Sequence, residues 1–328
     1  MSTLPVAPPV ALDRARELVD PLLLTAVARL CPELQPPVQH HLGGGGKHVR
    51  AALALLSAEA CGADVEVGLP GAVAIELVHN FSLLHDDVID GDRERRHRPT
   101  VWAQFGVGAA IIAGDALAIL ALEVLLEEPS PHAALAALEL ARATQAMTAG
   151  QADDMAFEVR PIVSLEECLR MEERKTGALL SCAPALGAML AGAPPATVDA
   201  LRDYGRHLGI AFQAVDDLLG IWGDPSVTGK PAGSDLRQHK KTLPVVAALA
   251  AADGMAGEFT ALLRGRLSER EVATAARFVE GYGGRDTTME VAERHLADAL
   301  GALDRVPLVP SATEELADIA NFVVGRDR

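Results

Sequence analysis

The sequence predicts an all-α fold, and three observations lead to this class. Alanine and leucine are abundant among the 328 residues, while aromatic residues make up only 3%. Strand-rich proteins use more β-branched and aromatic residues, so this composition favours packed helices. Apolar residues recur with helical spacing along almost the whole chain, and the alternation typical of strands is nearly absent. No linker or repeat divides the chain, so we expect one large helical bundle.

The helical periodicity predicts helices at 12–30, 47–62, 68–91, 100–126, 131–157, 164–173, 175–192, 195–222, 242–253, 268–281, 285–303 and 312–324. Three of these starts carry a capping box, in which serine is followed three residues later by glutamate: Ser164 with Glu167, Ser268 with Glu271, and Ser311 with Glu314. Residues 1–11 are rich in proline and predict a flexible tail before a single domain over 12–328. The loops 43–46 and 223–241 are too glycine-rich or too long for simple connectors.

Charge and composition exclude several classes of protein. With 45 acidic and 29 basic residues, the net charge of −16 repels nucleic acid and anionic lipid, so we expect neither as a partner. The apolar stretches 107–126 and 177–198 are interrupted by charges or by proline, so we expect buried helices and no membrane span. The four cysteines lack CxxC spacing, and the N-terminus lacks a secretory pattern, so a cytoplasmic protein is expected.

A first acidic motif, HDDVID, ends the predicted helix 68–91. Asp86 and Asp90 lie four residues apart and therefore share a helix face, with Asp87 beside them. Such like charges repel unless a cation compensates them, and carboxylate oxygens suit Mg²⁺. A solvated acidic face is the simpler alternative, but the apolar residues Phe81, Leu83 and Leu84 directly before the motif argue against plain exposure. The loop spacing of an EF-hand is absent.

A second acidic pair, Asp216 and Asp217, lies within the apolar segment 209–222. Two adjacent carboxylates in such a helix are unfavourable unless they are paired or bound to metal. A purely structural role would require two basic partners. Two acidic helices in one bundle favour a metal cluster shared between facing helices.

Three clusters of basic residues accompany the acidic motifs along the chain. A glycine loop leads into Lys47 and Arg50, which would share a helix face at i, i+3. Backbone N–H groups at a helix start also suit an anion. The other clusters are Arg95 with Arg96, and Lys230 with Lys240 and Lys241. Together they predict a polyphosphate held between basic groups and metal ions.

The ordered set of motifs resembles the trans-isoprenyl diphosphate synthases, the polyprenyl synthetase family. The matching pieces are GGKHVR at 45–50, HDDVID at 85–90 with Arg95-Arg96, Lys175-Thr176, FQAVDD at 212–217, and GDPSVTGKPAGSDL at 223–236. This resemblance implies an isoprenoid synthase bundle with a central cavity, usually a homodimer. It also implies Mg²⁺-dependent condensation of isopentenyl diphosphate with an allylic diphosphate to a short prenyl diphosphate.

The resemblance assigns a role to each matching residue. Asp86 and Asp90 would bind two Mg²⁺ ions and Asp216 a third, with Asp87 and Asp217 in support. Contacts to the allylic diphosphate would come from Arg95, Lys175 and Lys230. The isopentenyl diphosphate would be held by Lys47, Arg50, His79 and Arg96. Thr176 and Gln213 would face the reacting carbons, and Phe81 with Ser82 would set product length, most like a twenty-carbon geranylgeranyl diphosphate synthase.

Two positions depart from the family pattern. The second motif usually ends in a third aspartate, but position 220 is glycine, and Asp224 one turn later is the expected substitute. After Arg95-Arg96 the family usually has glycine, where this chain has His97.

The sequence is also consistent with two alternative functions. A class I terpene cyclase shares the acidic helices, but it has no need for a second diphosphate site. A non-catalytic partner subunit of a synthase is consistent with Gly220, whereas retention of the other acidic and basic residues argues against it.

Overall fold

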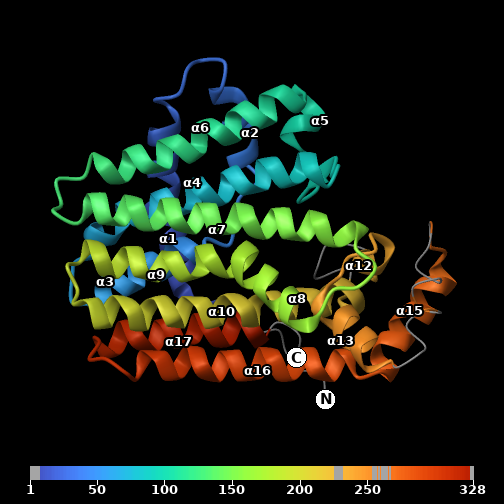
Figure 1. Cartoon of the computed structure of the whole chain (residues 1–328). Helices are drawn as coiled ribbons and strands as arrows, with labels where there is room; N and C mark the ends of the chain where they lie inside the picture. The colour runs from blue at the N-terminus through green and yellow to red at the C-terminus, as the bar shows by residue number, and fades with distance from the viewer. Residues whose placement is uncertain are drawn as a thin grey trace.

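The computed structural model of the chain describes residues 8–224, 232–252, 257, 259, 265 and 267–325. Long helices run roughly side by side through the molecule (Figure 1). Within the described part, the strands are a short antiparallel pair, β1 (Glu94–Arg95) with β2 (Arg98–Pro99). The predicted all-α class is confirmed.

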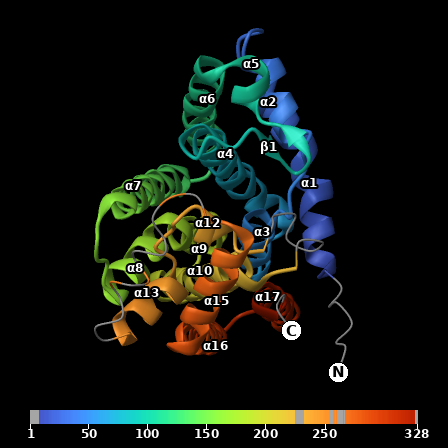
Figure 2. The same cartoon turned by 90° about the vertical axis from the view of Figure 1, so that its right-hand side faces the viewer.

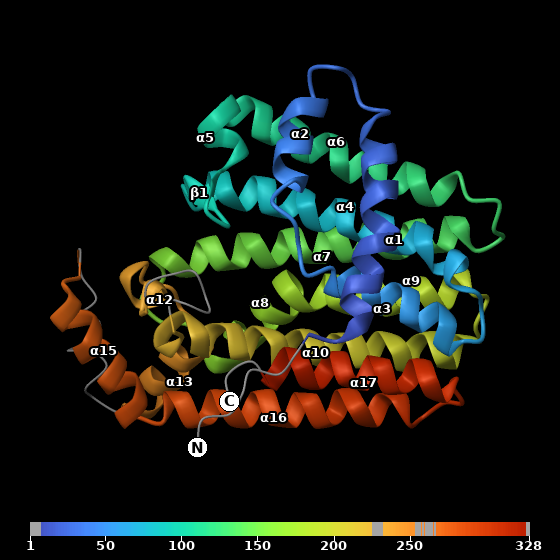
Figure 3. The same ribbon diagram turned by 180° about the vertical axis from the view of Figure 1, so that it is seen from behind.

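The helices follow one another in chain order as α1 (Val10–Val27), α2 (Gln35–Leu42), α3 (Val49–Ala60), α4 (Val65–Ile89), α5 (Val101–Phe105), α6 (Val107–Leu126), α7 (Ala133–Val159), α8 (Leu165–Glu172), the π-helical turn η1 (Glu173–Gly177), α9 (Ala178–Leu190), α10 (Pro195–Trp222), α12 (Ser234–Arg237), α13 (Leu243–Ala251), α15 (Glu269–Gly281), α16 (Gly284–Leu303) and α17 (Pro310–Val324). Helices α4, α9 and α10 form the centre, α1 to α3 lie behind them (Figure 3), and α16 and α17 run below α10 in Figure 1.

Small residues allow the central helices to pack closely. A Cβ atom on Gly187 of α9 would collide with the carbonyl oxygen of Ala54 on α3, and one on Gly205 of α10 would collide with that of Leu180 on α9. A methyl group at either site would force the helices apart, and core overpacking of this kind costs about 1–3 kcal/mol. The alanine-rich composition therefore has a structural consequence, because it sets short distances between helix axes.

Several predicted boundaries need correction. Helix α1 begins at Val10, inside the region predicted as a tail, and residues 1–7 of that tail lie outside the described residues. Helix α2 was not predicted. Its two prolines lie in the first turn, where proline is tolerated. The predicted helix 100–126 is divided at Gly106, whose φ is +90°. Helix α3 begins at Val49, since His48 is left-handed with φ of +51°.

Two of the three predicted capping boxes are confirmed. The side chains of Ser164 and Ser268 accept hydrogen bonds from the backbone N–H groups of Glu167 and Glu271, whose carboxylates reach back. The prediction for Ser311 is wrong. Helix α17 begins at Pro310, two residues earlier than predicted, so Ser311 lies inside the first turn and cannot cap it.

Two helices, α4 and α6, are long and apolar enough to cross a membrane by length and composition alone. Helix α4 passes through the centre of the bundle, so its apolar character is that of a core helix. Helix α6 is more exposed along its length.

Candidate functional site

The first acidic motif occupies the C-terminal end of α4. Asp86 is half-buried and Asp90 is exposed, whereas Asp87 is fully buried and accepts a hydrogen bond from Nε of Arg95 at 2.8 Å. Burial raises the pKa of Asp86 to about 6, against the opposing charge of Lys175. A divalent cation beside this carboxylate would keep it ionised.

The second acidic pair lies near the C-terminal end of α10, at the same end of the molecule (Figure 2). Asp217 is buried, and its two oxygens accept hydrogen bonds from Nε2 of Gln213 at 2.7 Å and from the backbone N–H of Leu243 at 2.8 Å. Burial raises the pKa of Asp217 to about 7, and burial beside Asp217 raises the pKa of Glu172 further. Among the described residues, Asp217 is therefore held by a side-chain amide and a backbone N–H.

The π-helical turn η1 carries Lys175 and Thr176 into the same region. Such turns insert one extra residue into a helix and are frequent at functional sites. Nζ of Lys175 lies 2.5 Å from a carboxylate oxygen of Asp154 on α7. Oγ1 of Thr176 donates to Oε1 of Gln213 at 2.7 Å, so these two predicted neighbours of the reacting carbons do lie together.

Acidic residues from several helices surround Lys240. Burial opposes its charge, but the carboxylates of Asp90, Asp235 and Asp154 together raise the pKa of Lys240. These three carboxylates come from the end of α4, from α12 and from α7. Asp217 of the second motif lines one small pocket together with Asp154, Asp235 and Lys240, so the two motifs border one region at this end of the bundle.

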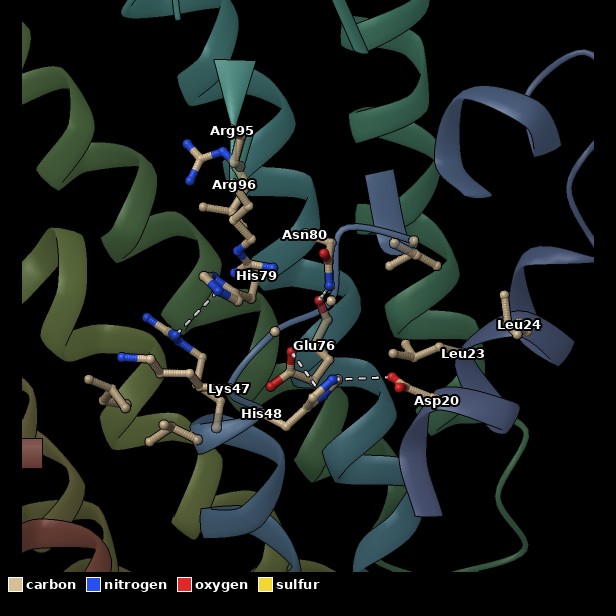
Figure 4. A pocket seen from close by; sticks show the side chains of 18 of the residues that line it. Asp20, Leu23, Leu24, Lys47, His48, Glu76, His79, Asn80, Arg95 and Arg96 are labelled. Atoms are coloured by element: carbon tan, nitrogen blue, oxygen red, sulfur yellow. Dashed lines mark hydrogen bonds and ion pairs between the residues drawn. The ribbon is translucent and has the colours of Figure 1, made fainter. Parts of the chain in front are cut away.

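A cavity of about 800 Å³ lies beside the acidic region and is lined by basic side chains. Its lining includes every predicted contact for isopentenyl diphosphate, namely Lys47, Arg50, His79 and Arg96. Arg95 and, from the second acidic motif, Asp216 also line it. In Figure 4, Arg95, Arg96, His79 and Lys47 follow one another along one side of this pocket, and Asp20, His48 and Glu76 lie together on the other.

His79 is a neutral member of this basic wall. Burial, with the positive charges of Arg50 and Arg96 nearby, holds the pKa of His79 well below its usual range. Its Nε2 lies 3.5 Å from Nη1 of Arg50, and a neutral imidazole nitrogen accepts that hydrogen bond. His79 therefore orients the Arg50 guanidinium without adding charge.

The glycine loop reaches the pocket in a different way from the prediction. Because α3 begins at Val49, Lys47 lies in the loop and shares no helix face with Arg50. The ring of His48 lies 3.2 Å from Asp20 and 3.8 Å from Glu76, and these contacts hold the left-handed backbone that turns Lys47 into the pocket. Lys47 and Arg50 thus both line the pocket, although they do not share a helix face.

The departures at positions 220 and 97 have structural explanations. A Cβ atom on Gly220 would collide with the carboxylate of Asp235, so Asp235 of α12 occupies the space beside Gly220. Asp224, the expected substitute, is exposed beyond the end of α10. His97 has φ of +60° in the turn between β1 and β2, a conformation that favours glycine and so accounts for the family's usual residue.

The predicted chain-length residue Phe81 is braced by its neighbours. Its ring meets that of His85 edge-on, with centroids 4.9 Å apart. Nε2 of His85 lies 3.0 Å from the carbonyl oxygen of Ile111, and the ring leaves no room for a Cβ atom at Gly114 of α6. Ser82 donates its hydroxyl to the carbonyl of His79 at 2.8 Å.

Some residues at the site were missed, and one predicted residue cannot be placed. Asp154, Glu172, Glu76 and Asp235 are carboxylates whose importance depends on partners distant in sequence, and His41 lies on the unpredicted helix α2. The adjacent acidic residues 153–154, late in a long helix, were the available signal for Asp154. Lys230 lies outside the described residues.

The donor set fits magnesium. Asp86, Asp90 and Asp216 offer carboxylate oxygens at two helix ends that border one region, and hard oxygen donors are what Mg²⁺ prefers. The half-buried Asp86, with its raised pKa, is a carboxylate that a cation would stabilise.

Comparisons with known proteins agree with this geometry. A family model for polyprenyl synthetase matches residues 31–279. The chain is 45% identical to a (2E,6E)-farnesyl diphosphate synthase of Mycobacterium tuberculosis, over 99% of this chain and 93% of the relative. It is also 43% identical to a geranylgeranyl diphosphate synthase of the same organism, over 89% and 87%.

Solved structures show the same likeness. A polyprenyl synthetase from Streptomyces coelicolor A3(2) matches with a TM-score of 0.92 and 50% identity, covering 96% of this chain and 99% of that one. A geranylgeranyl pyrophosphate synthase from Corynebacterium glutamicum, complexed with isoprenyl diphosphate and magnesium, matches with a TM-score of 0.83 and 28% identity, covering 97% and 98%. The chain therefore belongs to the polyprenyl synthetase family and is a prenyl diphosphate synthase, a transferase.

Proposed function

We propose that this enzyme condenses isopentenyl diphosphate with an allylic diphosphate, head to tail and in the trans configuration, in the presence of three Mg²⁺ ions. The observation that carries this proposal is the basic cavity directly beside the two acidic helix ends. Isopentenyl diphosphate needs cationic side chains, whereas the allylic diphosphate needs metal ions held by carboxylates. The chain offers both arrangements side by side.

The isopentenyl diphosphate lies in the basic cavity. Lys47 supplies a point charge, while Arg50 and Arg96 present planar guanidinium groups that match phosphate oxygens. The neutral ring of His79 keeps Arg50 oriented and offers its own polar edge. Glu76, buried beneath this wall, accepts a hydrogen bond from the backbone N–H of Ala51 at 3.2 Å and helps to fix the start of α3.

The allylic diphosphate lies on the acidic side. Asp86, Asp90 and Asp216 hold the metal ions, which when bound neutralise the negative charge that develops on the leaving diphosphate. Asp87 and Asp217 act in support, since both are buried and hydrogen-bonded to neighbouring residues. Arg95, Lys175 and Lys230 complete the contacts to this diphosphate.

The chemistry needs no protein nucleophile. The allylic C–O bond breaks, and the dipoles of Thr176 and Gln213 ease the positive charge on the remaining carbons. Alanine and leucine side chains of the central helices keep water away from this cation. The double bond of isopentenyl diphosphate, held close by its own basic site, attacks the cation, and the released diphosphate removes the proton.

Incubating the purified protein with Mg²⁺, isopentenyl diphosphate and each allylic primer in turn tests the activity, with products sized by mass spectrometry. We expect prenyl diphosphates of one main length. Consumption of the allylic substrate without isopentenyl diphosphate would indicate a terpene cyclase. No turnover with any primer would indicate a non-catalytic partner subunit.

We propose a twenty-carbon product, with Phe81 as the floor of the growing-chain tunnel. The bracing of Phe81 by His85, which is itself fixed to α6, makes it a rigid stop. Phe81→Ala is expected to shift the products to longer chains, whereas Phe105→Ala, at an exposed phenylalanine of α5, should leave them unchanged. An unaltered product distribution in Phe81→Ala would remove Phe81 as the floor.

We also propose a cytoplasmic homodimer, with a second copy of the chain covering α6 and α7. Large apolar side chains are exposed along these helices, among them Ile112 at 56%, Ile119 at 60% and Leu135 at 55%. An apolar patch of this kind marks an interface. Sedimentation is expected to give the mass of two chains for the wild type and of one chain for Ile119→Lys. An unchanged mass in that variant would place the interface elsewhere.

A further inference from the structure

A cluster of metal-ligand side chains lies away from the substrate cavity, where α10 packs against α16. His207 comes from α10, and His295 and Asp298 come from α16, where their i, i+3 spacing puts them on one face. Figures 1 and 3 show these two helices side by side along much of their length. His207 precedes Asp216 by nine residues, or about 14 Å along the helix. The cluster is therefore separate from the acidic motifs.

The three side chains direct their ligand atoms toward one point. The Nδ1 atoms of His207 and His295 lie 2.8 Å apart, and Oδ2 of Asp298 lies 3.7 Å from Nδ1 of His207. Around a tetrahedral zinc ion with bonds of about 2.0–2.1 Å, such atoms stand roughly 3.3 Å apart. The two imidazoles would have to separate slightly, and the half-exposed Asp298 would have to approach.

The protonation of the two rings is suited to metal binding. Burial, with the charge of Arg206 nearby, lowers the pKa of His207, and burial beside His207 and Arg294 lowers the pKa of His295 to about 4. Both imidazoles are therefore neutral at neutral pH, which is the form that binds metal.

We propose that His207, His295 and Asp298 bind one zinc-type transition-metal ion, which joins α10 to α16 with a water molecule as its fourth ligand. Two imidazoles and one carboxylate are a common donor set for Zn²⁺, whereas Mg²⁺ prefers oxygen donors alone. The site and the proposed magnesium site thus differ in the metal they select. The zinc site does not depend on the proposed prenyl transfer.

Arg206 must change its partner when the metal binds. Its Nη2 lies 2.8 Å from Nε2 of His207, and because guanidinium can only donate, Nε2 accepts and the ring proton is on Nδ1. Metal binding moves that proton to Nε2, so the hydrogen bond from Arg206 is lost. Arg206 already lies 3.7 Å from Glu173 and 3.6 Å from Asp203, which can retain it. This exchange and the nearby positive charges weaken the affinity for the metal.

Calorimetric titration of the full-length protein with Zn²⁺, in excess Mg²⁺ to occupy the carboxylate motifs, tests the site. We expect one Zn²⁺ per chain with micromolar Kd and a higher melting temperature with zinc. Both effects should persist in His132→Ala, a histidine distant from the cluster. In His295→Ala and Asp298→Ala the affinity should fall at least tenfold. Co²⁺ should give the visible absorption of a tetrahedral site in the wild type, and this absorption should be lost in the two variants.

The melting temperature of each zinc-free variant shows whether it is folded, and His295→Asn replaces His295→Ala if the alanine variant is not. Absence of Zn²⁺ binding in excess Mg²⁺ would overturn the proposal. Binding with unchanged affinity in folded variants at positions 295 and 298 would also overturn it.

Discussion

Asp86→Asn is expected to lower the turnover of isopentenyl diphosphate by about 10²–10³-fold, the loss typical of removing one electrostatic contact to the transition state. The substitution keeps the size of the side chain and removes its charge. Because Asp86 lies at the end of α4 with its pKa raised to about 6 by burial, the charge is unfavourable in the metal-free protein. The same residue that supports the reaction therefore costs stability when no metal is bound.

Because Asp86 supports turnover but lowers the stability of the metal-free protein, stability and turnover together test its role. The folded-state pKa lies above the unfolded value, so at neutral pH the ionised carboxylate favours the unfolded chain. The melting temperature of metal-free Asp86→Asn should accordingly equal or exceed that of the wild type. Mg²⁺ together with inorganic diphosphate should raise the wild-type melting temperature more than that of the variant.

A matched control is Asp13→Asn, at an exposed aspartate of α1 whose ion-pair partner is Arg16. Its turnover and its response to Mg²⁺ should match those of the wild type. If folded Asp86→Asn kept full turnover, Asp86 would not be a metal ligand.

The helical class, the order of most helices and the acidic motifs could be predicted because they depend on local spacing. The i, i+4 relation of Asp86 and Asp90 is fixed by the helix itself, and so is the burial of the apolar face around Asp217. The capping boxes at Ser164 and Ser268 are equally local. The resemblance supplied the remaining roles, which the sequence pattern alone left open.

The features that were missed depend on contacts between distant segments. The left-handed His48 is held by Asp20 of α1 and Glu76 of α4, so no local pattern could predict that α3 begins after it. The partner of Lys175 is Asp154 on another helix. His41 was missed because it lies on α2, a short helix that was not predicted.

Gly220→Asp, which restores the family's usual residue, is expected to destabilise the protein by about 1–3 kcal/mol, as in other cases of overpacking. The new side chain would collide with the Asp235 carboxylate and place a second negative charge beside it. Oγ of Ser234 lies 3.3 Å from both the Gly220 carbonyl and Oδ1 of Asp235, so the start of α12 rests directly on this part of α10. Displacing Asp235 would therefore displace α12 and weaken the acidic region around Lys240.

The double variant Gly220→Asp with Asp235→Gly separates this collision from any general intolerance at position 220. It keeps the number of carboxylates and removes the overlap, so its free energy of unfolding should recover toward the wild-type value. We expect a favourable coupling energy of about 0.5–3 kcal/mol between the two sites, measured by denaturant unfolding of all four proteins in a double-mutant cycle. Additive losses would show that the two positions act independently. Coupling in both stability and Mg²⁺ dependence would show that Asp235 has taken the place of the missing third aspartate.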